Sequence, residues 1–141
     1  MKGNSKSLKI GQIYLMEFSG GYNEQYGVRP GLVVQNNIGN AYSPNIIAVP
    51  LTSAIKKTDL PTHLIIEASP SGLKKDSVVL CENPERISKR RVGDFITELD
   101  SEQMKKVAKA YTLSSSIIAY LSIEELADVW GNSKRLNGMA M

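Results

Sequence analysis

The chain has 141 residues and a net charge of +3, from 17 Lys and Arg against 14 Asp and Glu. A chain of this length suits one domain whose single core is stable without disulfide bonds. The lone Cys81 excludes an intramolecular disulfide and a multi-cysteine metal site, and its place after Val78-Val79-Leu80 favours a buried, unreactive thiol.

Several further classes of protein and of site are disfavoured. No run approaches the roughly eighteen apolar residues of a membrane span, and the N-terminal residues lead into no signal-like apolar stretch, so we expect a cytoplasmic protein. The single histidine, His63, excludes a ribonuclease that uses two histidines of one chain. A Ser-His-Asp triad would need a serine at a sharp strand-to-helix turn, and no such motif is recognisable. A zinc site would need His63 together with scattered carboxylates, so neither site is expected.

Apolar and β-branched runs alternate with turn-forming residues and predict short strands. Residues 1–9 are polar and are expected to be disordered. The expected strands are 10–18, 31–36, 46–51, 63–67, 77–82 and 94–99. The polar, glycine-rich stretch 19–28 between the first two is longer than an ordinary hairpin turn, and loops of that length are often functional.

The hydrophobic period changes at Asp100, which forms a capping-box pattern with Gln103. Apolar residues then recur at helical spacing, at Met104, Val107, Ala108, Tyr111 and Ile118. The pattern predicts a helix over about 104–120 with one face on the core. A partner-binding helix is the alternative.

A second helix, 123–130, is predicted by the cap pair Ser122 and Glu125 and is expected to stop at Gly131, before a disordered tail. The fold class is therefore mainly β with a C-terminal helix. We expect a small barrel of five to seven short strands packed by one helix, with a short C-terminal helical extension. The chain is expected to divide into a disordered N-terminal segment over 1–9, a barrel domain over 10–122 and a C-terminal extension over 123–141.

Arg29 stands at the end of the first long loop, directly before the apolar run Leu32 to Val34. Pro30 fixes its own φ and biases Arg29 towards an extended conformation. A stiffly held guanidinium suits an anion such as phosphate, and a surface salt bridge is the alternative. Local basic clusters could follow a phosphate backbone or be solvated loop charges: 56–57, 74–75 and 86–91.

An ordered series of motifs runs through the middle of the chain, over about 10–121. It comprises Gly11-Gln12-Ile13-Tyr14, Glu24-Gln25, Val28-Arg29-Pro30, Leu32-Val33-Val34-Gln35-Asn36, Ile38-Gly39-Asn40, Tyr42-Ser43-Pro44, Leu51-Thr52-Ser53, Leu60-Pro61-Thr62-His63 and Lys75-Asp76-Ser77-Val78. This region resembles the MazF/PemK (Kid-like) family of toxin endoribonucleases.

The resemblance implies an SH3-like barrel with a C-terminal helix that forms a homodimer. It implies metal-independent, sequence-selective cleavage of single-stranded RNA with no cofactor. The 2′-OH attacks the phosphorus and leaves a 2′,3′-cyclic phosphate and a 5′-OH. The implied partner is an antitoxin of a type II toxin–antitoxin system whose acidic C-terminal segment covers the RNA groove, and the complex is expected to bind DNA.

Carried over by position, the resemblance implies that Arg29 and Thr52 are catalytic. A guanidinium and a hydroxyl can stabilise the charge that builds on the non-bridging oxygens during in-line attack. Proton transfer by Arg29 ranks second, because an arginine is a poor base. For Thr52 the alternative is a hydroxyl that caps a turn. The implied RNA contacts are Asn23, Glu24, Gln25, Pro30, Ser53, Glu82 and Asn83.

The sequence departs from the family pattern at two places. Asn23 replaces a common serine, and Glu82-Asn83-Pro84-Glu85 stands where many members read Glu-Gln-Ile-Arg, so Glu85 replaces a cation near the groove. Weaker activity or altered specificity would follow. The alternatives to cleavage are an RNA-binding module without catalysis and a toxin directed at a protein target such as a topoisomerase. Tyr22 and Tyr26 could stack on bases or only order the first loop.

Overall fold

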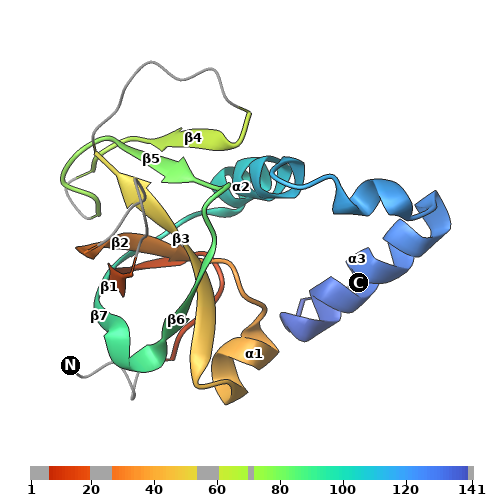
Figure 1. Cartoon of the computed structure of the whole chain (residues 1–141), viewed down its shortest axis with the longest axis horizontal. Coiled ribbons are helices and arrows are strands. Elements are labelled where there is room, and N and C mark those ends of the chain that lie inside the picture. Colours follow the sequence, from red (N-terminus) through yellow and green to blue (C-terminus); the bar gives the residue numbers. More distant parts are fainter. Residues whose placement is uncertain (1–6, 20–26, 54–60, 70–71, 140–141) are drawn as a thin grey trace.

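The computed structural model describes residues 7–19, 27–53, 61–69 and 72–139 (Figure 1). These residues form β1 (Gln12–Phe18), β2 (Gly27–Val33), α1 (Asn37–Tyr42), β3 (Asn45–Thr52), β4 (His63–Ile66), β5 (Ser77–Leu80), β6 (Glu85–Ser88), the 3-10 helix η2 (Lys89–Arg91), β7 (Val92–Glu98), α2 (Ser101–Leu113), the 3-10 helix η3 (Ile117–Tyr120) and α3 (Ile123–Leu136).

The strands form one antiparallel sheet in the order β4-β5-β3-β2-β1-β7, and β6 pairs with β3 beside this path. The mainly β class with helices at the C-terminal end is confirmed. Within the described residues the strand path has two ends, β4 and β7, so the sheet is open and the predicted closed barrel is not confirmed.

Apolar side chains bury themselves in two clusters on the sheet. One lies under α2 and contains Val107 and Ala110 of that helix against β-strand residues such as Leu32 and Val49. The other gathers residues of β1, β3 and β6, among them Met16 and Ile46. Burial of both faces explains why the central strands read as continuous apolar runs.

The predicted helix over 104–120 is confirmed only in its first part. The capping box at Asp100 forms, since its backbone N–H donates to Oε1 of Gln103 at 2.9 Å and its own Oδ1 accepts from the Gln103 N–H at 2.8 Å. The helix α2 then ends at Leu113, and Ile118 lies in the exposed 3-10 turn η3. The run Ser114-Ser115-Ser116 breaks the helix, because serine competes for backbone hydrogen bonds.

Two elements were missed by the strand pattern. Helix α1 replaces an expected turn, because Oδ1 of Asn36 accepts from the Gly39 N–H at 2.9 Å and caps the helix start. Strand β6 has the charged Glu85 and Arg86 before its one buried residue, Ile87, and so shows no apolar run. Strand β2 also begins at Gly27, four residues before its predicted start.

Helix α3 runs to Leu136 and passes through Gly131, where the sequence predicted its end. The predicted cap is present, since Oγ of Ser122 accepts from the Glu125 N–H at 3.1 Å. A glycine inside a helix destabilises it by about 1 kcal/mol relative to alanine. This cost is too small to end α3 at Gly131. At its far end, Oδ1 of Asn137 accepts from the Asn37 N–H of α1 at 2.9 Å and ties the helix to the body.

Cys81 is fully buried, which confirms the predicted environment of its thiol. Burial raises its pKa to about 11, with a smaller contribution from the negative charge of Glu82. In the part of the chain that the structure describes, no helix is long and apolar enough to cross a membrane.

We expect the Cys81 thiol of the folded protein to react far more slowly with iodoacetamide near neutral pH than the same thiol in guanidinium chloride. The thiolate is the reacting form, and a pKa of about 11 leaves almost none of it. Mass spectrometry of time points measures both rates. Equal rates in the folded and unfolded protein would contradict the buried, protonated thiol.

Candidate active site

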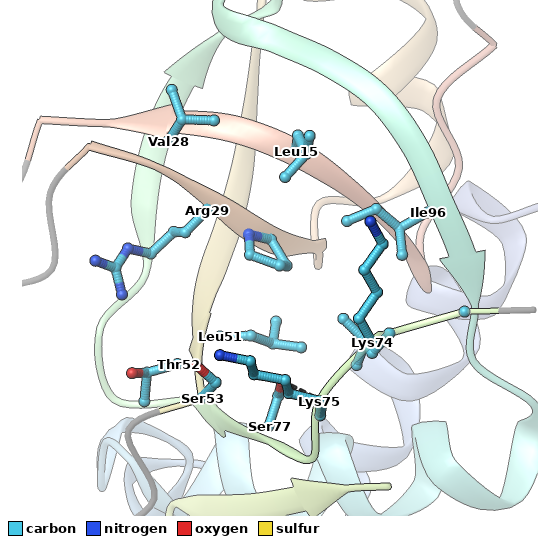
Figure 2. Close-up of a pocket in the computed structure, with 13 residues that line it drawn as sticks. Leu15, Val28, Arg29, Leu51, Thr52, Ser53, Lys74, Lys75, Ser77 and Ile96 are labelled. Carbon is cyan, nitrogen blue, oxygen red and sulfur yellow. Dashed lines mark hydrogen bonds between the residues drawn. The ribbon is translucent and has the colours of Figure 1, made fainter. Parts of the chain in front are cut away.

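A cavity of about 650 Å³ opens beside the ends of β2 and β3 (Figure 2). Its apolar wall is formed by side chains from four strands and the segment before β5. The lining residues are Leu15, Val28, Arg29, Pro30, Leu51, Thr52, Ser53, Gly72, Leu73, Lys74, Lys75, Ser77 and Ile96.

Arg29 lies in β2, paired with Met16 of β1. Its Nε atom is buried, so the base of the guanidinium is enclosed by the protein while the side chain lines the cavity. Gly31, two residues on, has Met16 and Phe18 packed against it, and a Cβ there would lie 2.7 Å from Sδ of Met16. The lack of a side chain at Gly31 thus lets the β1 side chains pack close to the backbone that carries Arg29.

Thr52 is the last residue of β3 and pairs with Val78 of β5. On its other edge, β3 pairs with β2 in the register Gly31 to Pro50. Extending that register by two residues sets Arg29 opposite Thr52. Figure 2 shows both side chains at the same side of the cavity, so the two residues predicted to be catalytic line one site.

Lys74 and Lys75 add two exposed ammonium groups to the cavity. Their backbone is held by Ser77, whose hydroxyl donates to the Lys75 carbonyl at 3.0 Å. In Figure 2 the Lys75 side chain extends towards Leu51 and Thr52. The sequence showed this basic pair but did not assign it to the site, because the strand register that brings β5 to β3 is not visible in the sequence.

The lining residues carry three cationic side chains and no carboxylate. Hydroxyl groups of Thr52 and Ser53 stand beside these cations. Such a site attracts an anion and offers it hydrogen-bond donors, because guanidinium, ammonium and hydroxyl groups all donate to phosphate oxygens. The open mouth suits one segment of a longer chain as well as a small molecule.

The predicted contact residues do not all gather here. Pro30 and Ser53 line the cavity, whereas Glu82 and Asn83 do not. Glu82 follows β5 four residues beyond Val78, or about 13 Å along an extended strand. Its Oε2 lies 2.6 Å from Nε2 of His63. Asn23, Glu24 and Gln25 lie outside the described residues, as do Tyr22 and Tyr26.

Glu85 has a structural role that its charge did not reveal. Its Oε2 accepts two hydrogen bonds from Ser19, at 2.9 Å from the backbone N–H and 2.6 Å from the hydroxyl. These bonds join the start of β6 to the end of β1, where the first long loop begins. The anion at this position therefore ties the start of β6 to the residue that follows β1.

No group of three or more His, Cys, Asp or Glu side chains that could hold a metal ion occurs within residues 7–19, 27–53, 61–69 and 72–139.

Comparison with known proteins identifies the family. A family model described as PemK-like, MazF-like toxin of type II toxin–antitoxin system matches residues 9–114. The chain belongs to this family. The protein named Endoribonuclease EndoA from Bacillus subtilis (strain 168) is 44% identical over 114 residues, which are 80% of this chain and 98% of that protein. The Staphylococcus saprophyticus protein named Endoribonuclease MazF is 39% identical over 108 residues, 76% of this chain and 90% of that protein.

Solved structures show the same fold. A mycobacterial endoribonuclease, determined in complex with its cognate antitoxin, has a TM-score of 0.62 at 27% identity and covers 76% of this chain and 93% of that one. MazF from Deinococcus radiodurans has a TM-score of 0.67 at 22% identity, over 77% of this chain and 96% of that one. The MazF-like match thus extends over the sheet and α2, and the family model ends before η3 and α3.

We expect Glu85→Gln to lower the free energy of unfolding by about 1 kcal/mol, because the neutral amide accepts more weakly from Ser19 than the carboxylate does. Urea denaturation followed by circular dichroism measures the change. The matched control is Glu67→Gln at the exposed end of β4. Equal midpoints for both variants would contradict the anchoring role of Glu85.

Proposed function

We propose that this chain is the toxin of a type II toxin–antitoxin system and cleaves single-stranded RNA at selected sequences. The observation that carries the proposal is the pairing of Arg29 and Thr52 in one cationic cavity. Membership of the PemK/MazF-like family and two relatives named endoribonucleases, at 44% and 39% identity, support it. We infer that the protein acts in the cytoplasm, and that its open sheet corresponds to the SH3-like barrel that the resemblance implies.

The proposed chemistry is transesterification without a metal ion. The ribose 2′-OH attacks the adjacent phosphorus, the bond to the 5′ oxygen breaks, and the products carry a 2′,3′-cyclic phosphate and a 5′-OH. The 2′-OH loses its proton and the leaving 5′ oxygen gains a proton, so this step consumes no water. Arg29 and the Thr52 hydroxyl donate to the non-bridging oxygens, where negative charge builds up in the transition state.

The other cavity residues have roles in binding. Lys74 and Lys75 stand at the rim as counter-charges for phosphates that flank the scissile one. Leu15 and Ile96, both half-buried, supply apolar surface on which a ribose or base can rest. Because an ammonium is a point charge without sequence preference, we assign selectivity to residues nearer the bases, among them Asn23 to Gln25, Glu82 and Asn83.

The proposed protein partners are an antitoxin and a second copy of the chain. The mycobacterial neighbour was solved with its cognate antitoxin, which supports an antitoxin for this chain as well. Its acidic C-terminal segment would compete with RNA for the cations of the cavity. The proposed complex of the two proteins binds DNA.

The first experiment incubates purified protein with a long single-stranded RNA in excess EDTA, beside Arg29→Ala and Thr52→Ala. We expect discrete cuts with cyclic phosphate ends, slowed about 10²–10³-fold in each variant because each removes one donor to the charged transition state. Mapping of the 5′ ends reveals the preferred sequence.

Two outcomes would contradict this proposal. Cleavage by Arg29→Ala at the wild-type rate would remove Arg29 from the site. RNA left intact by folded wild-type protein would favour an RNA binder or a toxin with a protein target, and a DNA supercoiling assay with gyrase would test the latter.

Lys75→Ala is expected to weaken RNA binding at all sequences and to reduce the slope of log K against log salt by about one, because one phosphate contact is lost. Fluorescence anisotropy of a labelled oligonucleotide at several salt concentrations measures the slope. The matched control is Lys106→Ala on the exposed face of α2. Identical slopes for the two variants would show that Lys75 does not contact phosphate.

A further inference from the structure

One face of the sheet connects the catalytic candidates to an ion pair that the proposed mechanism does not use. Opposite residues of antiparallel strands point to the same face of a sheet, and successive residues of one strand point to opposite faces. Val78 of β5 lies opposite Thr52 of β3 on one edge and opposite Ile65 of β4 on the other. His63 lies two residues before Ile65 in β4. Thr52, Ile65 and His63 therefore share one face, which we call the Thr52 face.

The burial of β4 agrees with this assignment of faces. Leu64 packs against the hydrophobic cluster under α2 and Ile66 is buried in that cluster, so both point away from the Thr52 face. Ile65, between them, is 52% exposed. A base that covers Ile65 would remove apolar surface from water, which is favourable.

Glu82 meets His63 on the Thr52 face. Its Oε2 atom lies 2.6 Å from Nε2 of His63. The His63 side chain is 15% exposed and the Glu82 side chain is 33% exposed. The carboxylate is therefore the partner that a ligand reaches more easily, and the imidazole supports it from the side of the protein.

Backbone hydrogen bonds hold the segments that carry this pair. The Cys81 N–H donates to the Thr62 carbonyl at 3.1 Å, and the Asn83 N–H donates to the Leu80 carbonyl at 3.0 Å. These bonds fix the backbone on both sides of the carboxylate and directly before the imidazole. An ionised carboxylate only accepts hydrogen bonds, so Nε2 of the imidazole is the donor. A carboxylate held in this way keeps one orientation.

A carboxylate on the same face as a phosphate site is suited to a base and not to the RNA backbone, because it repels phosphate. Cytosine, adenine and guanine each carry an exocyclic amino group that can donate to a carboxylate. Uracil carries a carbonyl oxygen where cytosine carries its amino group, and two acceptors cannot bond to each other. Glu82 therefore favours a base that has an amino group.

We propose that His63 is a positioning residue that holds the Glu82 carboxylate as the acceptor for the amino group of one RNA base, which rests on Ile65. Glu82 lies about 13 Å along an extended strand from Val78, the residue that pairs with Thr52, so the base belongs to a nucleotide beside the one that reacts. This inference rests on the proposed function, since it takes RNA as the ligand. It concerns which bases are accepted and not how the bond breaks.

The test uses a pool of single-stranded RNA with randomised positions. Molecules that the protein cleaves and molecules that it retains on a filter are sequenced separately. For the unmodified chain we expect one position at which uracil is about tenfold rarer than the bases with an amino group, because uracil forfeits a hydrogen bond to a charged group. Equal use of all four bases at every position would overturn the proposal.

Variants of the pair separate positioning from a purely structural role. Glu82→Ala is expected to abolish the exclusion of uracil and His63→Ala to weaken it several-fold, while the preferences at all other positions stay as in the wild type. His63→Gln should restore most of it, because the amide keeps a donor. The matched control is Glu124→Ala on the exposed first turn of α3, which should change nothing. A His63→Ala profile that equals the wild type, or that relaxes at every position alike, would overturn the positioning role.

The surface under the base is tested by Ile65→Ser. We expect weaker retention of the whole pool with the same preferred bases, since the apolar contact does not distinguish one base from another. A change in the preferred bases would assign the selection to Ile65 and overturn the role of Glu82.

The two readouts distinguish failure of this inference from failure of the proposed function. Retained molecules that exclude uracil through Glu82, with no RNA cut, would overturn the cleavage proposal and support the inference. Cleavage at discrete sites with no position that depends on Glu82 would support the cleavage proposal and overturn the inference. Neither cleavage nor retention would overturn both.

Discussion

Strand β3 is the constraint on which the sheet and the candidate site both depend. It pairs with β2 along one edge and with β6 and then β5 along the other, so its backbone is hydrogen-bonded on both sides. Its side chains from Ala48 to Leu51 are buried. A shift of one residue in this register would exchange the side chains that β3 gives to the two apolar clusters. The resulting loss of close packing disfavours the shift and so keeps Thr52 beside β2.

The cationic character of the site follows from the position of the end of β3. Three cations from two segments, Arg29 of β2 and the pair Lys74 and Lys75 before β5, meet at one cavity because β2 and β5 both pair with β3. Charges gathered in advance need no reorganisation when an anion arrives, which is the condition for electrostatic stabilisation of a transition state. The apolar wall strengthens these interactions, because it keeps water away from one side of the charges.

Most strands and the pairing of Arg29 with Thr52 could be foreseen from residue patterns and motif resemblance. Strand β6 could not, since its single buried residue, Ile87, gives no periodic signal. Helix α1 was hidden because asparagine and glycine also signal turns, and only the bond from Asn36 to the Gly39 N–H distinguishes the two. Likewise, the role of Glu85 depends on Ser19, 66 residues away in sequence, and such contacts follow from the fold.

Helix α3, which lies beyond the family model, meets the family domain at its far end through Asn137 and Asn37, away from the cavity that contains Arg29. Substitutions on the exposed face of α3 therefore leave the catalytic candidates untouched.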